Sequence, residues 1–468
     1  MFVGRQAELK TLEKLYLSDD FEFAVVYGRR RVGKSSLLNE FSHYKDNVIF
    51  FSGIEFDGLE NLNIAVANIL NCKAIPHVVA APKTFLEAFQ LVFEASLKEK
   101  IVLIIDEYPY LARADKSLNS VLQMLIDKYK DKSKLKLIIS GSSMSFMEKE
   151  VLSYKAPLYG RRTAQLKIDP FNFKDSLLMM PKMKDEDSFI LYSVLGGTPK
   201  YLECINTKLD AFSNIEEIFF DKSSFIFEEP LNLFRQEVRE PSIYNAIVKA
   251  IADGASRVAE ISTKLGIPSA TTSIYLKNLI DLGIVKKENP YLDDNSKKSI
   301  YEIKDNLYKF YYKYIPGNEI LINSGASLIL LSRIKASLSE YLGKSFEEIC
   351  KEYLILQLLR GKLPLVFGAL GRWWGNDKTK KCQTEIDIMA QQDPNTALFA
   401  ECKWTNEKVD QKVLETLVER SHLFKYTTSC LYLFSKSGFT KGCSELAKKL
   451  GNVYLVTFDE MMKEFRQK

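Results

Sequence analysis

Residues 23–36 read Phe-Ala-Val-Val-Tyr-Gly-Arg-Arg-Arg-Val-Gly-Lys-Ser-Ser, an apolar run that leads into a loop framed by two glycines. The run at 23–27 predicts a buried strand, and the residues after Ser35 continue in a helical pattern. A strand, a tight turn and a helix N-terminus form the context in which backbone N–H groups bind phosphate. The stretch therefore predicts a P-loop, and a purely structural turn is the less favoured interpretation.

The residues of this loop have expected tasks. Lys34 is expected to reach the β- and γ-phosphates of a nucleoside triphosphate, and the Ser35 hydroxyl is expected to ligate Mg²⁺. The two glycines let the backbone turn its N–H groups inward around the anion. The predicted nucleotide-binding residues of the loop are Gly28, Arg29, Arg30, Arg31, Val32, Gly33, Lys34, Ser35 and Ser36.

A second apolar run, residues 101–105, ends on Asp106 and Glu107. A strand of this kind carries its last residues to the carboxyl edge of a parallel sheet, where nucleotides bind. Asp106 is expected to hold Mg²⁺, directly or through water, and Glu107 to polarise the attacking water as a general base. Two solvated acids after a strand are common, but together with the upstream loop they predict binding and hydrolysis of ATP or GTP.

The length and composition limit the number of domains and the classes of protein to which the chain can belong. A chain of 468 residues suggests two to four domains at roughly 150 residues each. No apolar segment is long enough to span a bilayer, and the N-terminus lacks a signal-peptide pattern, so we expect no membrane association. The seven cysteines form no CxxC pair and no histidine lies at zinc spacing from them, which favours a reducing cytoplasm. The net charge of +5 neither requires nor excludes nucleic acid.

The order of patterns along the chain predicts an α/β protein of several domains. Candidate strands alternate with helices in residues 1–170, which predicts a parallel sheet covered on both faces. These strands are 23–28, 48–53, 101–107, 135–142 and 163–168. The expected domains are an ATPase domain (1–170), a helical lid (171–240), a winged helix-turn-helix (241–315) and a second α/β domain (316–468).

Several separate motifs in the first half resemble the prokaryotic AAA+-related, STAND-like P-loop ATPases abundant in archaea. They are residues 2–9, 27–35, 104–107, 140–142, 158–163 and 196–202. The resemblance implies ATP as the nucleotide and an ASCE sheet, in which the 135–142 strand lies between the P-loop strand and the Asp106 strand. It also implies a helical lid that packs over the nucleotide.

The same resemblance assigns roles that the residues alone leave open. It implies that the Arg5 segment lies near the adenine, that Pro199 belongs to the GxP signature of the lid, and that Ser142 is a sensor. It further implies that Arg161 or Arg162 is an arginine finger. From sequence alone, Ser142 could equally begin a loop, and the arginines could belong to a solvated basic loop.

The middle of the chain resembles a winged helix-turn-helix. Two helical patterns, 256–266 and 269–282, precede two short strands, 284–287 and 299–303, and Ser256 is the expected N-cap of the first helix. The expected DNA contacts are Thr271, Thr272, Ser273, Tyr275 and Lys277 in a groove, and Lys286, Lys287, Lys297 and Lys298 at phosphates. One lysine on the helix face and acids at the wing tip, Asp293-Asp294-Asn295, favour interdomain packing instead, so both interpretations stay open.

A second chemical pattern lies near the C-terminus. Residues 384–390 and 397–404 alternate like neighbouring strands, which puts Glu401 and Lys403 on one face and Cys402 on the other. Glu401 and Lys403 opposite Asp387 offer two carboxylates for Mg²⁺ and an ammonium group near an attacking water. On the preceding helix, Glu347 flanks the apolar face and can lean into this site, whereas Glu348 is expected to point to solvent.

Residues 343–347, 371–375, 385–388 and 401–404 resemble the DUF234-type C-terminal domain of these ATPases, which is similar to PD-(D/E)xK nucleases of the Holliday-resolvase type. The resemblance implies a restriction-endonuclease-like fold, with Glu347, Asp387, Glu401 and Lys403 as catalytic residues and Asp387 and Glu401 as metal ligands. The chain departs from the pattern at Ile386, which precedes Asp387 in place of proline. A folded remnant with surface carboxylates is the alternative, and Gln411 is a substrate-positioning or an ordinary surface residue.

The leading hypothesis is an ATPase whose nucleotide state controls DNA binding or metal-dependent DNA cleavage by the C-terminal domain. The alternative is a STAND-like regulatory ATPase whose other domains only bind a partner or DNA. A chaperone-like remodeller is less favoured because no substrate-threading loop is evident. ATP, Mg²⁺ and DNA are the expected ligands, and formation of a homo-oligomer is left open.

Overall fold

The computed structural model describes residues 2–55, 58–78, 80–293, 298–377 and 380–467. The chain divides into two compact units, and each is described by itself. The first unit runs to Phe171 and includes Thr198–Lys200; the second comprises Asn172–Gly197 and the residues from Tyr201 onward. Within the described residues, no helix is long and apolar enough to cross a membrane.

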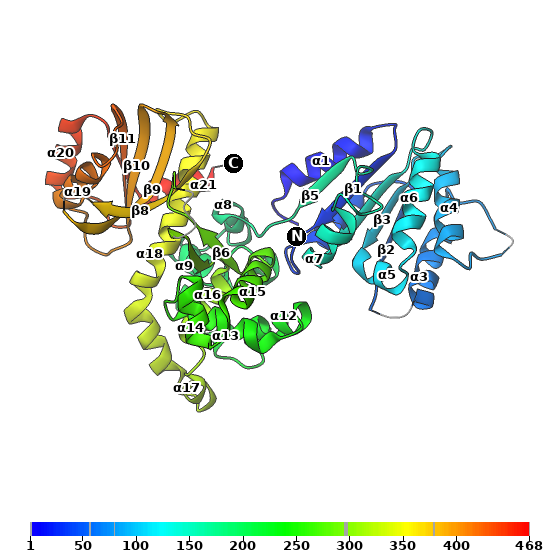
Figure 1. The fold of residues 1–468 in the computed structure, drawn as a ribbon, viewed down its shortest axis with the longest axis horizontal. Helices are drawn as coiled ribbons and strands as arrows, with labels where there is room; N and C mark the ends of the chain where they lie inside the picture. The colour runs from blue at the N-terminus through cyan, green and yellow to red at the C-terminus, as the bar shows by residue number, and fades with distance from the viewer. Residues whose placement is uncertain (1, 56–57, 79, 294–297, 378–379, 468) are drawn as a thin grey trace. The chain divides into compact units, whose positions relative to one another are not determined.

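The first unit is built on a five-stranded sheet in which every strand pair is parallel, with the order β2-β3-β4-β1-β5 (Figure 1). The strands are β1 (Glu22–Tyr27), β2 (Val48–Ser52), β3 (Val102–Asp106), β4 (Lys136–Gly141) and β5 (Ala164–Lys167). The five strands expected from the sequence are therefore confirmed. Because β4 lies between β1 and β3, the expected ASCE order is confirmed as well.

Two apolar layers cover this sheet, since successive strand residues point to opposite faces. On β1, Val25 belongs to one buried layer and Val26 to the other. The layer containing Val26 packs under α1 and α2, whereas the layer containing Val25 packs under α3–α6. The helices are α1 (Gln6–Leu17), α2 (Lys34–Ser42), α3 (Gly58–Leu70), α4 (Phe85–Ala95), α5 (Tyr108–Ala114), α6 (Leu118–Tyr129) and α7 (Met144–Phe146).

The second unit begins with helices and a small hairpin. The two helices and two short strands expected for a winged helix-turn-helix are present as α14, α15, β6 and β7, although Arg257 rather than Ser256 is the N-cap of α14. The segment comprises α8 (Phe173–Ser176), α9 (Asp185–Leu195), α10 (Pro199–Leu202, shared with the first unit), α11 (Ala211–Phe219), α12 (Glu229–Glu237), α13 (Pro241–Ala252), α14 (Val258–Leu265), α15 (Ser269–Asp281), β6 (Val285–Glu288), β7 (Ile300–Ile303), α16 (Asn306–Tyr314) and α17 (Glu319–Asn323).

The rest of the second unit is an α/β domain with a mixed five-stranded sheet in the order β12-β11-β10-β9-β8 (Figure 1). The strands β8, β9 and β10 are antiparallel neighbours, whereas β10, β11 and β12 run parallel. A helix of 33 residues, α18, precedes this sheet. The elements are α18 (Ser327–Leu359), β8 (Leu370–Asp377), β9 (Cys382–Asp393), β10 (Thr396–Lys403), α19 (Gln411–Ser421), β11 (Thr428–Ser435), α20 (Lys441–Leu450), β12 (Val453–Thr457) and α21 (Phe458–Arg466).

Candidate functional site

The loop at residues 28–33 connects β1 to α2 at the carboxyl edge of the first sheet. A Cβ atom on Gly28 would lie 2.2 Å from the carbonyl oxygen of Ile168, so no larger residue fits there without moving the backbone. Arg31 and Gly33 have φ values of 71° and 92°, in the left-handed region that favours glycine. The loop is thus a tight turn whose shape depends on these backbone conformations.

The loop lysine lies inside this turn. The Nζ atom of Lys34 donates to the carbonyl oxygens of Gly28 (3.0 Å) and Arg29 (3.1 Å), and the side chain is buried. Val32 is fully buried in the apolar layer of the sheet, so only its backbone can face a ligand. Arg30 donates from its guanidinium to the hydroxyl of Tyr110 (2.8 Å) on α5.

Asp106 at the end of β3 joins the loop to the neighbouring strand. The Ser35 hydroxyl donates to its Oδ2 atom (2.5 Å), and the Ser140 hydroxyl on β4 donates to its Oδ1 atom. A hydroxyl and a carboxylate in contact are oxygen donors of the kind that Mg²⁺ prefers. The residues therefore fit a magnesium ion held by Ser35 and Asp106.

Glu107 follows with φ 48°, a left-handed conformation that is unusual for glutamate. The hydroxyl and backbone N–H of Ser142 donate to its Oε2 atom at 2.8 Å and 3.2 Å. Gly53 at the end of β2 makes room, since a Cβ there would lie 2.7 Å from the carbonyl oxygen of Glu107. The carboxylate of the expected general base is thus oriented by the expected sensor.

Arg5 and Pro199 also lie at the loop. The guanidinium of Arg5 donates to the carbonyl oxygens of Val32 (3.0 Å) and Asp169 (2.6 Å). A Cβ on Gly33 would lie 3.8 Å from Pro199. The structure therefore brings both residues to the P-loop, where Arg5 supports the loop backbone.

The second candidate site lies on β9 and β10. Asp387 is buried and accepts the backbone N–H of Cys402 (2.8 Å), while Glu401 accepts from Lys403 (2.7 Å) and from Arg420 on α19 (3.0 Å). Burial, with the negative charges of Glu401 and Glu347, raises the pKa of Asp387 to about 7. The two carboxylates and the lysine expected from the sequence are therefore close together.

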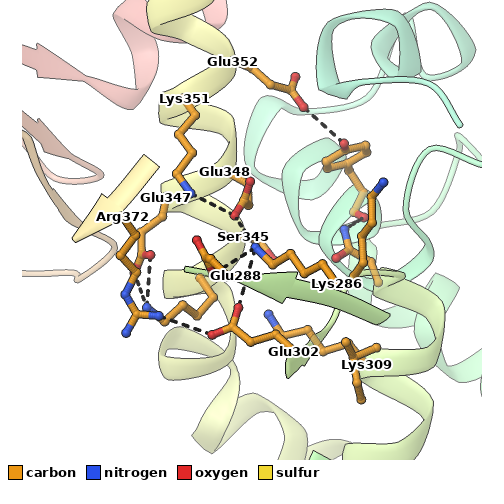
Figure 2. Close-up of a pocket in the computed structure, with 15 residues that line it drawn as sticks. Lys286, Glu288, Glu302, Lys309, Ser345, Glu347, Glu348, Lys351, Glu352 and Arg372 are labelled. Atoms are coloured by element: carbon orange, nitrogen blue, oxygen red, sulfur yellow. Dashed lines mark hydrogen bonds and ion pairs between the residues drawn. The ribbon is translucent and has the colours of Figure 1, made fainter. Parts of the chain in front are cut away.

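Glu347 on α18 lines a cavity of about 270 Å³ (Figure 2). It pairs with Lys344 (3.0 Å), and burial raises its pKa. Glu348 is more exposed but is not free in solvent, because it pairs with Lys286 (3.1 Å) and Lys351 (3.2 Å). Although burial acts in the opposite direction, these lysines lower the pKa of Glu348 to about 2.

The second site offers few candidate ligands for a metal ion. Among the described residues, no three His, Cys, Asp or Glu side chains are grouped as metal ligands. Asp387 and Glu401 supply carboxylate oxygens, and burial together with the negative charges of Glu401 and Glu347 raises the pKa of Asp387. The pair therefore fits a divalent cation, and Glu347 is not grouped with it as a ligand.

Comparisons with known proteins agree with both halves of the chain. Residues 2–205 match a family described as "ATPase domain predominantly from Archaea", and residues 311–414 match DUF234, "Archaea bacterial proteins of unknown function". An uncharacterized protein of Methanocaldococcus jannaschii is 36% identical over 427 residues, 90% of this chain and 92% of the relative. The chain belongs to the archaeal-type P-loop ATPases with a DUF234 domain.

Other relatives of this DUF234 ATPase match shorter regions or only the fold. An uncharacterized ATP-binding protein of the same organism is 42% identical over 45 residues, 10% of this chain and 76% of the relative. The solved Walker-type ATPase of Pyrococcus abyssi is 20% identical, with a TM-score of 0.48, and the match covers 67% of this chain and 96% of that chain. Residues 245–287 match a helix-turn-helix family described as "Bacterial regulatory protein, arsR family".

The structure of the ATPase does not bring the candidate arginine fingers to its P-loop. Thr163, which precedes β5, donates its backbone N–H to the carbonyl oxygen of Phe23 (2.8 Å) at the start of β1. Since β1 and β5 are parallel, Arg161 and Arg162 lie at the amino edge of the sheet, opposite the P-loop. Arg161 also pairs with Asp127 (2.6 Å). The expectation of an arginine near the γ-phosphate of its own chain is therefore wrong.

The helix-turn-helix of the ATPase exposes only part of the expected DNA surface. On α15, Thr272 is buried and donates to the carbonyl oxygen of Pro268 (3.1 Å), so its expected groove contact is wrong. The Tyr275 hydroxyl donates to Glu240 (2.6 Å). The exposed residues on this helix face include Thr271, Ser273 and Lys277.

The wing likewise exposes only some of the lysines that were expected to contact phosphates. Lys286 is part of the ion-pair network around Glu348, and Lys298 pairs with Asp293 (2.6 Å), whereas Lys287 is exposed. Asp294, Asn295 and Lys297 lie outside the described residues.

Sequence reasoning missed several residues that complete the two sites. A role was expected for Ser142 and none for Ser140, although residues two apart along a strand share a face. Gly53 and Arg420 carry no local sequence signal, because their importance comes from contacts with Glu107 and Glu401.

Proposed function

We propose that this protein hydrolyses ATP at the P-loop and that its nucleotide state controls metal-dependent DNA cleavage by the DUF234 domain. The observation that carries the proposal is the presence of two clusters of candidate catalytic residues in one chain. Asp106 and Glu107 are held by hydroxyl groups at the carboxyl edge of the first sheet, and Asp387, Glu401 and Lys403 meet on the second.

In the ATPase step, the Lys34 ammonium group leaves the loop carbonyls and contacts the β- and γ-phosphates. Ser35 and Asp106 would hold Mg²⁺, which would supply positive charge at the phosphate oxygens. Glu107, oriented by Ser142, accepts a proton from the attacking water.

In the cleavage step, Lys403 lies against Glu401 and supplies positive charge beside the attacked phosphate. Asp387 and Glu401 are the residues that would hold a divalent cation, which would supply positive charge at the attacked phosphate. The seven cysteines are free thiols, which supports the reducing cytoplasm as the proposed compartment.

Two variants test the two sites separately. Lys34→Ala should abolish ATP turnover, whereas Ser36→Ala should preserve it, because Ser36 would contribute only a backbone N–H. Asp387→Asn should abolish DNA cleavage with Mg²⁺ or Mn²⁺ and leave ATP turnover unchanged, with Asp393→Asn on the same strand as the control. Cleavage that survives in Asp387→Asn shows that the nuclease assignment is wrong.

A regulatory ATPase without nuclease activity is the second candidate. It is favoured by the hydrogen bonds of Glu401. Lys403 donates to one of its carboxylate oxygens and Arg420 donates to the other. Purified protein that hydrolyses ATP but cleaves neither single-stranded, duplex nor branched DNA with either metal supports this alternative.

A further inference from the structure

A second cavity in the second unit, of about 430 Å³, lies between the helix-turn-helix and the β8–β9 hairpin. Its size falls within the roughly 300–1,000 Å³ typical of ligand pockets. Arg257 and Lys298 line it from the helix-turn-helix, and Trp373, Trp374, Asn376 and Gln383 line it from the hairpin.

The walls of this cleft are held by specific contacts. The backbone N–H of Tyr291, in the segment after β6, donates to the carbonyl oxygen of Arg372 on β8 (2.8 Å), and its hydroxyl donates to the carbonyl oxygen of Ala369 (3.2 Å). Trp373 packs edge-on against Phe424, with ring centroids 4.9 Å apart. These contacts hold β8 and the segment after β6 together beside the cleft.

The chemistry of the lining is that of a nucleic-acid site. Among the described residues no carboxylate lines it, whereas the cavity in Figure 2 is lined by five glutamates, four of which pair with lysines or an arginine of its lining. Lys298 is shared with Asp293, so one acid does lie next to the cleft. Proteins that bind single strands combine cationic groups for the backbone with aromatic rings on which exposed bases stack.

We propose that this cleft takes an unpaired nucleotide of single-stranded DNA, with the base against Trp374 and the phosphate near Arg257 and Lys298. Amide groups of Asn376 and Gln383 are available to the base edge. A base in a duplex is stacked on both faces, so the cleft selects unpaired DNA over duplex DNA.

The position of the cleft links the binding of DNA to the proposed cleavage. The role of this binding rests on that proposed function. Gln383 and Asp387 lie on the same strand, four residues apart, which is roughly 13 Å along β9. A strand anchored in the cleft would therefore pass near the carboxylate pair. The proposed substrate of the DUF234 domain is accordingly DNA with an unpaired segment.

The test uses the full chain in EDTA, where metal-dependent cleavage cannot occur. Tryptophan fluorescence is titrated with a ten-residue thymidine oligonucleotide and, in parallel, with a blunt duplex. Two of the three tryptophans line the cleft, while Trp404 is buried elsewhere, so the oligonucleotide should quench the emission. The duplex should bind at least tenfold more weakly.

Variants separate stacking from general charge attraction. Trp374→Ala should weaken the oligonucleotide Kd by roughly 5- to 150-fold, and Trp374→Phe should recover most of the affinity because phenylalanine also stacks. Tyr454→Ala, an exposed aromatic on the opposite edge strand β12, should leave the Kd unchanged. Lys298→Gln removes one positive charge from the phosphate path, so the slope of log K against log salt should become shallower by about 0.7.

The outcomes distinguish this inference from the proposed function. Equal oligonucleotide affinity in wild type, Trp374→Ala and Trp374→Phe, or tighter binding of the duplex, overturns the inference even if Asp387-dependent cleavage is found. A Kd that weakens in Trp374→Ala and recovers in Trp374→Phe supports the inference even if no cleavage occurs.

Discussion

Glu352 on α18 should make the stability of the second unit fall as the pH rises. Its Oε2 atom accepts the backbone N–H of Phe173 (2.8 Å), and the Tyr192 hydroxyl donates to Oε1 (3.4 Å), so the carboxyl group lies in the packing of α8, α9 and α18. Burial raises the pKa of Glu352 from 4.5 to about 7. Because the folded-state pKa is the higher one, the folded state binds the proton more tightly than the unfolded state.

The direction and the size of this pH effect follow from the difference between the folded-state and unfolded-state pKa values of Glu352. The stabilisation by protonated Glu352 is complete below pH 4.5 and is lost as the pH rises to about 7. A rise of this size corresponds to about 3 kcal/mol. Glu352→Gln keeps an acceptor for Phe173 without the buried charge, so it should be nearly neutral at about pH 5 and stabilising by up to about 3 kcal/mol at about pH 8.

Urea unfolding followed by tryptophan fluorescence measures this effect, since all three tryptophans lie in the second unit with Glu352. Asp210→Ala is the control in the same unit, because hydrogen bonds from Ser213 lower the pKa of Asp210 and its charge does not act on Glu352. Its removal should destabilise the unit equally at both pH values, which lie above the ordinary pKa of an aspartate. If Glu352→Gln changes the free energy of unfolding equally at both pH values, the assigned burial of this carboxyl group is wrong.

Three further predictions concern the first unit. Arg161→Ala should change ATP turnover by less than about twofold and cost at most about 1 kcal/mol, because its ion pair is partly exposed at the sheet edge opposite the P-loop; a tenfold loss of turnover would contradict this placement. Ser142→Ala should lower kcat by roughly 10- to 100-fold with little change in KM for ATP, since the hydroxyl orients the carboxylate of Glu107; an equal effect on KM would argue for direct nucleotide contact. Gly28→Ala should abolish ATP binding in calorimetry, because its Cβ would collide with a backbone carbonyl, whereas Gly343→Ala, which has open space in α18, should bind normally.

Much of the fold could be predicted, because the patterns that indicate its strands involve residues close together in the chain. The strands β1, β3 and β4 are continuous apolar runs, which are typical of strands buried on both faces, and they lie within a residue or so of the predicted bounds. The position of β4 between β1 and β3 came from the family resemblance and is confirmed. The sequence could not show which serine at the end of β4 contacts which acid, because Ser140 and Ser142 share a face. Only the packing places Ser140 against Asp106 and Ser142 against Glu107.

The two errors have different causes. Arg161 directly precedes the last strand of the predicted parallel sheet, and the start of a parallel strand lies at the amino edge, opposite the P-loop; the arginine-finger role came from the family resemblance. Thr272 lies on a helix of 13 residues whose buried face is defined by its neighbours, and not by the weak apolar pattern of the helix itself. This second error depends on contacts between residues that are far apart in the chain.

What the sequence determined by itself was the kind of chemistry, because a phosphate-binding turn and an acidic strand end depend on residues adjacent in the chain. The chain order also placed Lys34 and Ser35 at a helix N-terminus and Glu401 and Lys403 on one strand face. Only the tertiary structure decided which groups meet: Ser35 with Asp106, Arg420 with Glu401, and the two tryptophans of β8 with the helix-turn-helix. Such meetings depend on strand order and side-chain packing, which are cooperative properties of the whole chain and have no local sequence signal.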